Sequence, residues 1–127
     1  MPKILFAEDG VTVMRLSGAL FDRFDLDLDV VTDGRTALNR IAGAPKAYDL
    51  VILGYELPEI SGPECVTFLR SMFRRLPILV LSETVDEARL NELAKSGVRR
   101  DHILQKPTDP ETFAAWVNRA LAEAYPP

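Results

Sequence analysis

The sequence has little sulfur or imidazole chemistry: Cys65 and His102 are the only cysteine and the only histidine among 127 residues. A single cysteine cannot form an internal disulfide, and one cysteine with one histidine cannot supply the four ligands of a structural zinc site. Cys65 falls in the apolar pattern of an expected helix, so we expect a packed thiol in the core. Disulfide scaffolds and zinc modules are therefore excluded.

Long apolar runs and a basic surplus are also missing. No run approaches the roughly 18 residues that a membrane helix requires, and no signal peptide is visible. The chain has 15 Lys and Arg against 19 Asp and Glu, a net charge of −4, whereas general nucleic-acid binders usually carry excess positive charge. We therefore expect one cytoplasmic domain over residues 1–127, with neither nucleic acid nor membrane as a partner.

Five short apolar runs alternate with five segments of helical periodicity. The runs cover residues 3–7, about 25–31, 50–53, 78–81 and 101–105. This alternation predicts an α/β fold in which right-handed crossovers place helices on both faces of a parallel sheet. For a chain of this size we expect the flavodoxin-like (βα)5 three-layer sandwich with strand order 2-1-3-4-5.

Several helix boundaries have recognisable signals. Ser61 and Glu64 have the spacing of a capping box, and Pro63 between them suits a first helical turn. Thr84 and Glu87 have the same spacing and predict the start of the next helix. Gly97 is expected to end that helix.

Four of the expected strands are followed by residues that could form a site, most of them polar. They are Glu8 and Asp9 after the first, Gly54 and Glu56 after the third, Ser82 and Glu83 after the fourth, and Lys106 and Pro107 after the fifth. In a doubly wound parallel sheet, the functional crevice lies beyond the carboxyl ends of the strands. Carboxylates there suit a magnesium ion, which prefers oxygen ligands.

The stretch from Tyr48 to Gly62 resembles the third strand and following loop of the receiver domains of two-component response regulators. It has an apolar run, a Leu-Pro step and a glycine. The resemblance covers the whole chain and implies a role for each residue at the strand ends. In that family an acidic pair holds Mg²⁺, a Ser or Thr binds the phosphoryl group, and a Lys-Pro step supplies a cation, often with a cis peptide bond. The positions that match are Glu8, Asp9, Ser82, Lys106 and Pro107.

Three departures accompany the resemblance. Gly54 stands where receivers have the phosphate-accepting aspartate, so that position offers no nucleophile and one metal ligand fewer. We expect weakened Mg²⁺ binding by Glu8 and Asp9, with a contribution from Glu56. Ile103 stands where receivers usually have a Tyr or Phe that switches rotamer, and Glu83 replaces a small residue and adds negative charge.

These departures favour a degenerate receiver: a non-enzymatic module of signal transduction that binds proteins without aspartyl phosphorylation. Lys106 could then be a permanent counter-ion that imitates the signalling-competent arrangement. The resemblance implies a histidine kinase, an output domain or another signalling protein as partner, and a homodimer through the fourth helix, fifth strand and fifth helix (85–97 and 103–123).

Two alternatives stay open. The first is a receiver that is phosphorylated at a relocated acceptor such as Glu56. The second is a nucleotide- or flavin-binding module of the same topology. The second is less favoured, because no Gly-rich or Ser/Thr-rich phosphate loop follows the first strand.

Overall fold

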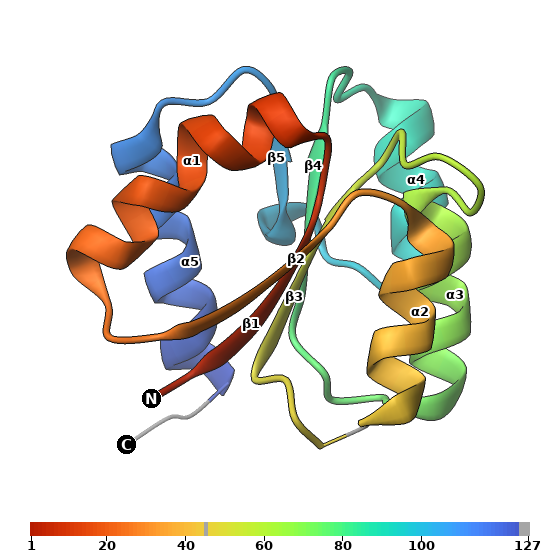
Figure 1. The fold of residues 1–127 in the computed structure, drawn as a ribbon. Helices are drawn as coiled ribbons and strands as arrows, with labels where there is room; N and C mark the ends of the chain where they lie inside the picture. The colour runs from red at the N-terminus through yellow and green to blue at the C-terminus, as the bar shows by residue number, and fades with distance from the viewer. Residues whose placement is uncertain (45, 125–127) are drawn as a thin grey trace.

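A computed structural model describes residues 1–44 and 46–124. Within these residues five parallel strands form one sheet in the order β2-β1-β3-β4-β5, so the predicted fold class and strand order are confirmed (Figure 1). The strands are β1 Lys3–Ala7, β2 Asp27–Val31, β3 Leu50–Gly54, β4 Ile78–Ser82 and β5 Ile103–Gln105. The helices are α1 Gly10–Arg23, α2 Gly34–Gly43, α3 Gly62–Met72, α4 Glu87–Ser96 and α5 Pro110–Ala124.

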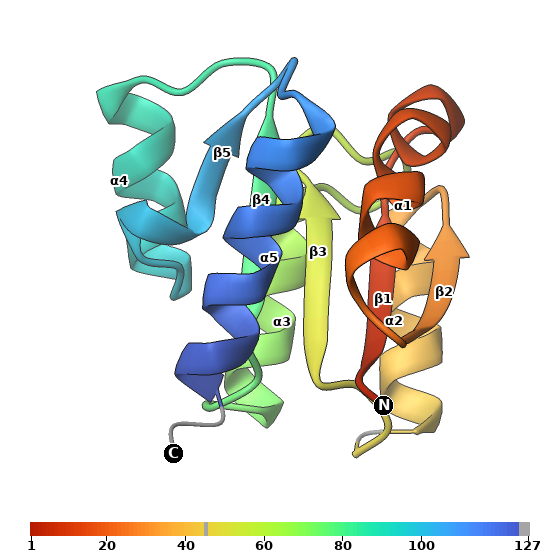
Figure 2. The ribbon, with the colours of Figure 1, turned by 90° about the vertical axis from the view of Figure 1, so that its left-hand side faces the viewer.

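Helices cover both faces of the sheet, which gives the predicted three layers. Helices α1 and α5 lie side by side on one face, and α2, α3 and α4 lie on the other (Figures 1 and 2). Every residue of β3 and β4 is buried, as expected for central strands that are covered on both faces. Cys65 is fully buried in the layer of α2, α3 and α4, and burial raises the pKa of its thiol to about 12. None of the described helices is long and apolar enough to cross a membrane.

Helix starts follow side-chain capping. The capping box of Ser61 and Glu64 forms as predicted. The box expected from Thr84 does not form, because α4 begins at Glu87 with Asp86 as its N-cap, and the Asp86 carboxylate accepts from the Arg89 N–H. The Thr84 carbonyl instead accepts a hydrogen bond from the Ser82 hydroxyl, which keeps that residue in the loop.

The last strand is shorter than its apolar pattern suggested. Residues Arg100–His102 form a 3₁₀ turn, closed by a hydrogen bond from the His102 N–H to the Arg99 carbonyl, so β5 begins at Ile103. Gly97 ends α4 with a φ of 117°, as predicted. The run Gly43-Ala44-Pro45 in the sequence also predicts the end of the second helix, and Tyr125-Pro126-Pro127 predicts the end of the last one. Pro45 and residues 125–127 lie outside the described residues.

The loop that follows β3 is packed too tightly for two of its neighbouring glycines to carry side chains. A Cβ on Gly62 would lie 2.5 Å from the Gly54 carbonyl oxygen, and one on Gly34 would lie 1.9 Å from the Ile60 carbonyl oxygen. These contacts are with backbone atoms, which cannot rotate away. The loop is therefore held against the starts of α2 and α3, beside the carboxyl end of β3.

Candidate functional site

The strand-end residues that the sequence analysis predicted for the site lie together at one edge of the sheet. Glu8 follows β1, Gly54 ends β3, Ser82 ends β4 and Lys106 follows β5. The Lys106 Nζ lies 2.7 Å from Glu8 Oε1 and 4.0 Å from Glu56 Oε1. Because parallel strands share the orientation of their carboxyl ends, side chains up to 98 residues apart in the sequence come together here.

Glu8 and Lys106 form a buried ion pair. Their side chains are 3% and 12% exposed, and the peptide bond between Lys106 and Pro107 is cis, as the resemblance implied. Burial raises the pKa of Glu8, although hydrogen bonds from Lys106 and from the Asp9 N–H act in the opposite direction. Burial acts to lower the pKa of Lys106, but the hydrogen bond to Glu8 and the negative charges of Glu8, Glu56 and Asp9 raise it.

The Glu8 carboxylate lies directly beside Gly54. A Cβ added to Gly54 would be 2.5 Å from Glu8 Oε1 and 2.8 Å from Glu8 Cδ. The space into which a side chain at position 54 would project therefore holds the carboxylate of Glu8. This carboxylate is paired with Lys106, and it comes from the residue that follows β1 rather than from β3.

Asp9 has a structural task in addition to its place at the site. Its carboxylate caps α1 by accepting from the Thr12 N–H at 2.8 Å and the Thr12 hydroxyl at 2.9 Å. The backbone hydrogen bond from Thr12 is the main reason why the pKa of Asp9 is lowered to about 2. Asp9 therefore stays ionised, but both of its oxygens already accept hydrogen bonds.

Arg89 is the functional residue that the sequence analysis did not place at this site. Its guanidinium reaches from α4 to donate hydrogen bonds to Glu56 and, at 2.9 Å, to the buried Ser82 hydroxyl. The same group lies 4.0 Å from the centroid of the Tyr55 ring, a cation–π contact. Tyr55 in turn donates through its hydroxyl to Glu92 of α4.

The observed start of α4 at Glu87 helps to explain this role. Arg89 is in the first turn of α4, where the helix dipole disfavours positive charge. A cation in that position indicates a nearby anion, and Glu56 supplies it.

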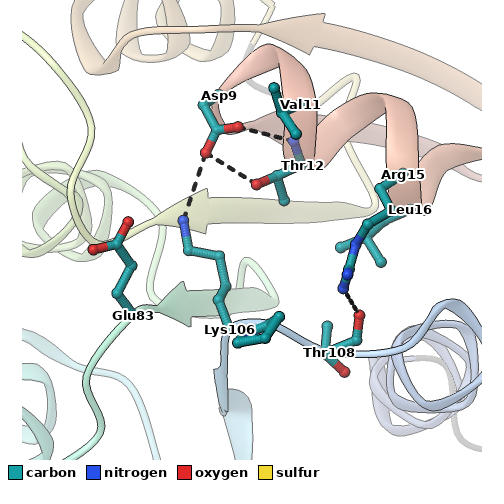
Figure 3. Close-up of a pocket in the computed structure, with 9 residues that line it drawn as sticks. Asp9, Val11, Thr12, Arg15, Leu16, Glu83, Lys106 and Thr108 are labelled. Carbon is teal, nitrogen blue, oxygen red and sulfur yellow. Dashed lines mark hydrogen bonds and ion pairs between the residues drawn. The ribbon is translucent and has the colours of Figure 1, made fainter.

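A cavity of about 500 Å³ lies beside this cluster, between α1 and the connection from β5 to α5. Figure 3 shows Asp9 and Thr12 above Lys106, with Glu83 on the opposite side from Arg15. Arg15 crosses from α1 to donate to the Thr108 carbonyl. Glu83 is thus at the rim of this cavity, and its backbone N–H donates to Glu56 at 3.2 Å.

Ile103 lies away from this cluster. It opens β5 opposite Val80, and its half-buried side chain packs against the core on the side of α2, α3 and α4. Ile103 is at the start of β5, whereas Lys106 follows the end of β5, so Ile103 is not part of the Glu8–Lys106 ion pair.

A second polar cluster is on the surface near the end of α5. Ligand atoms of Asp101, His102 and Glu123 lie within 4.8 Å of one another. However, an Arg99 nitrogen lies 2.9 Å from Glu123 and 3.1 Å from His102, so a cation already occupies the cluster. His102 Nε2 in turn lies 3.0 Å from Glu123 Oε2.

Comparisons with known proteins agree with the resemblance. The family model described as response regulator receiver domain matches residues 4–118. The regulatory protein SphR of Synechococcus elongatus is 30% identical over 112 residues, which cover 83% of this chain and 43% of SphR. The curated relatives that we compared are longer proteins: the chain spans 13% to 53% of their length.

Solved structures give the same result. The chemotaxis response regulator CheY4 of Vibrio cholerae superposes with a TM-score of 0.79 at 30% identity, covering 94% of this chain and 98% of CheY4. A two-component response regulator from Clostridium difficile has a TM-score of 0.85 at 23% identity, covering 98% of this chain and 99% of that one.

Proposed function

The chain belongs to the response regulator receiver domain family, and on that premise we propose that it is a receiver whose signalling state does not depend on aspartyl phosphorylation. The observation that carries the proposal is the Glu8 carboxylate beside Gly54, bound to Lys106. Phosphoryl transfer requires a nucleophilic oxygen in line with the phosphorus and free cations for the equatorial oxygens. Gly54 supplies no such oxygen, and Lys106 is already neutralised.

The second support for this proposal is that the groups of the site are satisfied by one another. Arg89 donates to Ser82 and Glu56, so the hydroxyl that would bind a phosphoryl oxygen already has a charged donor. No buried side-chain nitrogen or oxygen in the described part of the chain lacks a hydrogen-bond partner. A phosphate is therefore not needed to complete the cluster.

The contacts of Arg89 also determine the position of α4. Arg89 and Glu92, both on α4, bind Glu56 and Tyr55 of the loop after β3. In our proposal these two contacts keep α4 in one position against the sheet. The surface of α4, β5 and α5 then presents one constant arrangement to a histidine kinase, an output domain or another signalling protein. The role is binding rather than catalysis.

Magnesium does not fit this arrangement of carboxylates. Glu8 is bound to Lys106, Glu56 is bound to Arg89, and Asp9 caps α1. Mg²⁺ requires nearly octahedral oxygen ligation, and both cations would have to leave before these oxygens could turn to a common point.

This reading predicts that millimolar MgCl₂ leaves the melting temperature of the natural chain unchanged. A ligand that binds only the folded state stabilises it by RT ln(1 + L/Kd), where L is the free ligand concentration, and so raises the melting temperature once that concentration exceeds Kd. Differential scanning fluorimetry with and without MgCl₂ therefore tests the prediction. NaCl at matched ionic strength is the control. A rise with MgCl₂ alone would mean that the ion displaces Lys106 or Arg89.

Incubation with acetyl phosphate and MgCl₂, followed by intact-mass measurement, tests the proposed function itself. The natural chain should gain no phosphoryl adduct. The matched positive control is the double variant Gly54→Asp with Glu8→Asp, which restores an acceptor and shortens the side chain that lies in its space.

An adduct on the natural chain would contradict the proposal. If that adduct disappears in Glu56→Gln, the acceptor has moved to Glu56, which is the alternative reading. The contacts weigh against that outcome, because one oxygen of Glu56 accepts from Arg89 and from the Glu83 N–H.

A further inference from the structure

Helix α1 has two apolar faces. Val13, Leu16 and Leu20 are buried against the sheet and α5. On the opposite side, Val11, Met14 and Phe21 are 78%, 83% and 56% exposed. Figure 2 views the molecule from the side of α1 and α5, and no other element covers the outer side of α1 in that view. We call the exposed set, with Gly18 between its members, the outer stripe.

The spacing of the outer stripe is that of a helix-packing seam. Its members stand at positions 11, 14, 18 and 21, which recur at intervals of three and four residues. Residues with that spacing share one helix face. The buried residues at 13, 16 and 20 occupy the other face, so the outer stripe is directed toward solvent.

Gly18 lies in the middle of α1, and no contact within the monomer requires a glycine at this position. A Cβ at this position would meet no atom within 4 Å. Glycine destabilises a helix interior relative to alanine, so a larger residue would serve the isolated molecule better. A glycine at the centre of an exposed apolar face instead permits a second helix to approach closely.

We propose that the outer stripe is the contact surface for a second copy of this chain, with the two α1 helices packed antiparallel and crossing at Gly18. In that arrangement a two-fold axis passes near Gly18 and relates one copy to the other. Met14, four residues before Gly18, then faces the region of Phe21 of the second copy. The contact therefore buries apolar side chains that each monomer leaves exposed.

Charges beside the stripe are self-complementary in the same arrangement. Arg15 precedes Gly18 by three residues and Asp22 follows it by four, on one flank of the stripe. Within the described residues neither has a carboxylate or cation partner within 4.0 Å, although Arg15 donates to the Thr108 carbonyl. In an antiparallel pair, each Arg15 lies opposite the Asp22 of the other copy, which gives two equivalent ion pairs.

Exposed apolar side chains distinguish the outer stripe of α1 from the surface of α4, β5 and α5, which the family resemblance suggested as the dimer interface. None of the exposed large hydrophobic side chains among the described residues lies on α4, β5 or α5. Charged residues near α4 and α5 pair within the monomer instead, as Arg100 does with Glu87 and Arg99 with Glu123. A contact made by one helix from each copy is small compared with the ~1,000 Å² of stable interfaces, so we expect dissociation in the micromolar range.

Analytical ultracentrifugation of the full chain over a range of concentrations tests the inference. The natural chain should reach a monomer–dimer equilibrium, and Gly18→Gln should weaken dimerisation at least tenfold by separating the helices. The same change should preserve or raise the melting temperature, because glutamine is a better helix former than glycine. Met72→Gln, which alters an exposed apolar residue of α3, is the matched control and should leave the equilibrium unchanged.

Mixing two charge variants gives an independent test. Arg15→Glu and Asp22→Arg should each dimerise poorly alone, because like charges then meet across the axis. An equimolar mixture should form a heterodimer, because each altered residue then meets an opposite charge. A loss of contact with Thr108 in Arg15→Glu would not produce that recovery.

Three results would overturn the inference. The natural chain could remain monomeric up to millimolar concentration, Gly18→Gln could dimerise as well as the natural chain, or the charge variants could fail to recover on mixing. Dimers that persist in Gly18→Gln but dissociate when Arg100 is changed to Glu would assign the interface to α4, β5 and α5 instead. None of these outcomes depends on phosphorylation, so they do not test the proposed function, which the acetyl phosphate experiment tests separately.

Discussion

Replacing Lys106 by methionine should lower the free energy of unfolding by about 3 to 4 kcal/mol, because the buried Glu8 carboxylate loses the cation that neutralises it. The partner is Glu8, whose carboxylate is 3% exposed and lies 2.7 Å from the lysine nitrogen. Methionine keeps most of the volume of the lysine stem, so the loss reports charge rather than packing. Urea denaturation at neutral pH measures it.

A second substitution separates charge from other effects. Glu8→Gln in the Lys106→Met background removes the unpaired charge and should recover much of the loss, since removing both partners of a buried pair costs little compared with removing one. Lys95→Met, at an exposed position of α4, is the matched control and should change stability by less than about 0.5 kcal/mol. Equal losses for Lys95 and Lys106 would contradict the prediction.

The pH dependence of this variant has a definite sign. Burial raises the pKa of Glu8 above 4.5, the ordinary value, and removal of Lys106 raises it further, because the lysine acts to lower it. Between the ordinary and the raised pKa, the folded state binds more protons than the unfolded state, so stability falls as pH rises. The deficit of Lys106→Met should therefore shrink as the pH is lowered from neutral toward 4.5.

The fold could be predicted because its signals are local and agree with one another. Apolar runs alternate with helical periodicity along the whole chain, and that alternation admits few arrangements. Once the order of strands is known, Glu8, Ser82 and Lys106 must lie at one edge of the sheet, so the membership of the site follows as well.

The internal arrangement of the site could not be predicted, because it depends on side-chain conformations across distant elements. The position of the Glu8 carboxylate beside Gly54 results from the pairing of β1 with β3. The reach of Arg89 depends on where α4 begins, and the spacing of Thr84 and Glu87 placed that start too early. With Asp86 as the cap, Arg89 is directed at Ser82 and Glu56.

Each of the two cations of the site has a separate structural consequence. Lys106 joins β5 to β1 through Glu8, and Arg89 joins α4 to β4 and the loop after β3. In the phosphate-independent arrangement that we propose, the absence of a carboxylate at position 54 does not leave either cation unpaired, because Glu8 pairs with Lys106 and Glu56 pairs with Arg89. On that proposal, a lysine and a serine at these strand ends do not by themselves indicate phosphotransfer.

Gly54→Asp should destabilise the protein by about 2 kcal/mol, the scale of overpacking together with a like-charge contact. The new Cβ would lie 2.5 Å from Glu8 Oε1, so Glu8 must move, and two carboxylates then compete for Lys106. Glu8→Asp in the same background shortens the competing side chain and should recover part of the loss. Gly43→Asp, where a Cβ meets no atom within 4 Å, is the control and should cost much less.

Magnesium should stabilise the Gly54→Asp variant against urea, although it should have no effect on the stability of the natural chain. With an added carboxylate at position 54, acidic groups exceed the cations that neutralise them, and a divalent ion can relieve the repulsion. MgCl₂ should therefore raise the urea midpoint of Gly54→Asp and leave that of the natural chain unchanged. If Gly54→Asp matches the natural chain in stability and does not respond to MgCl₂, Glu8 does not hold the space of the missing side chain. The phosphate-independent arrangement would then have to rest on Arg89 alone.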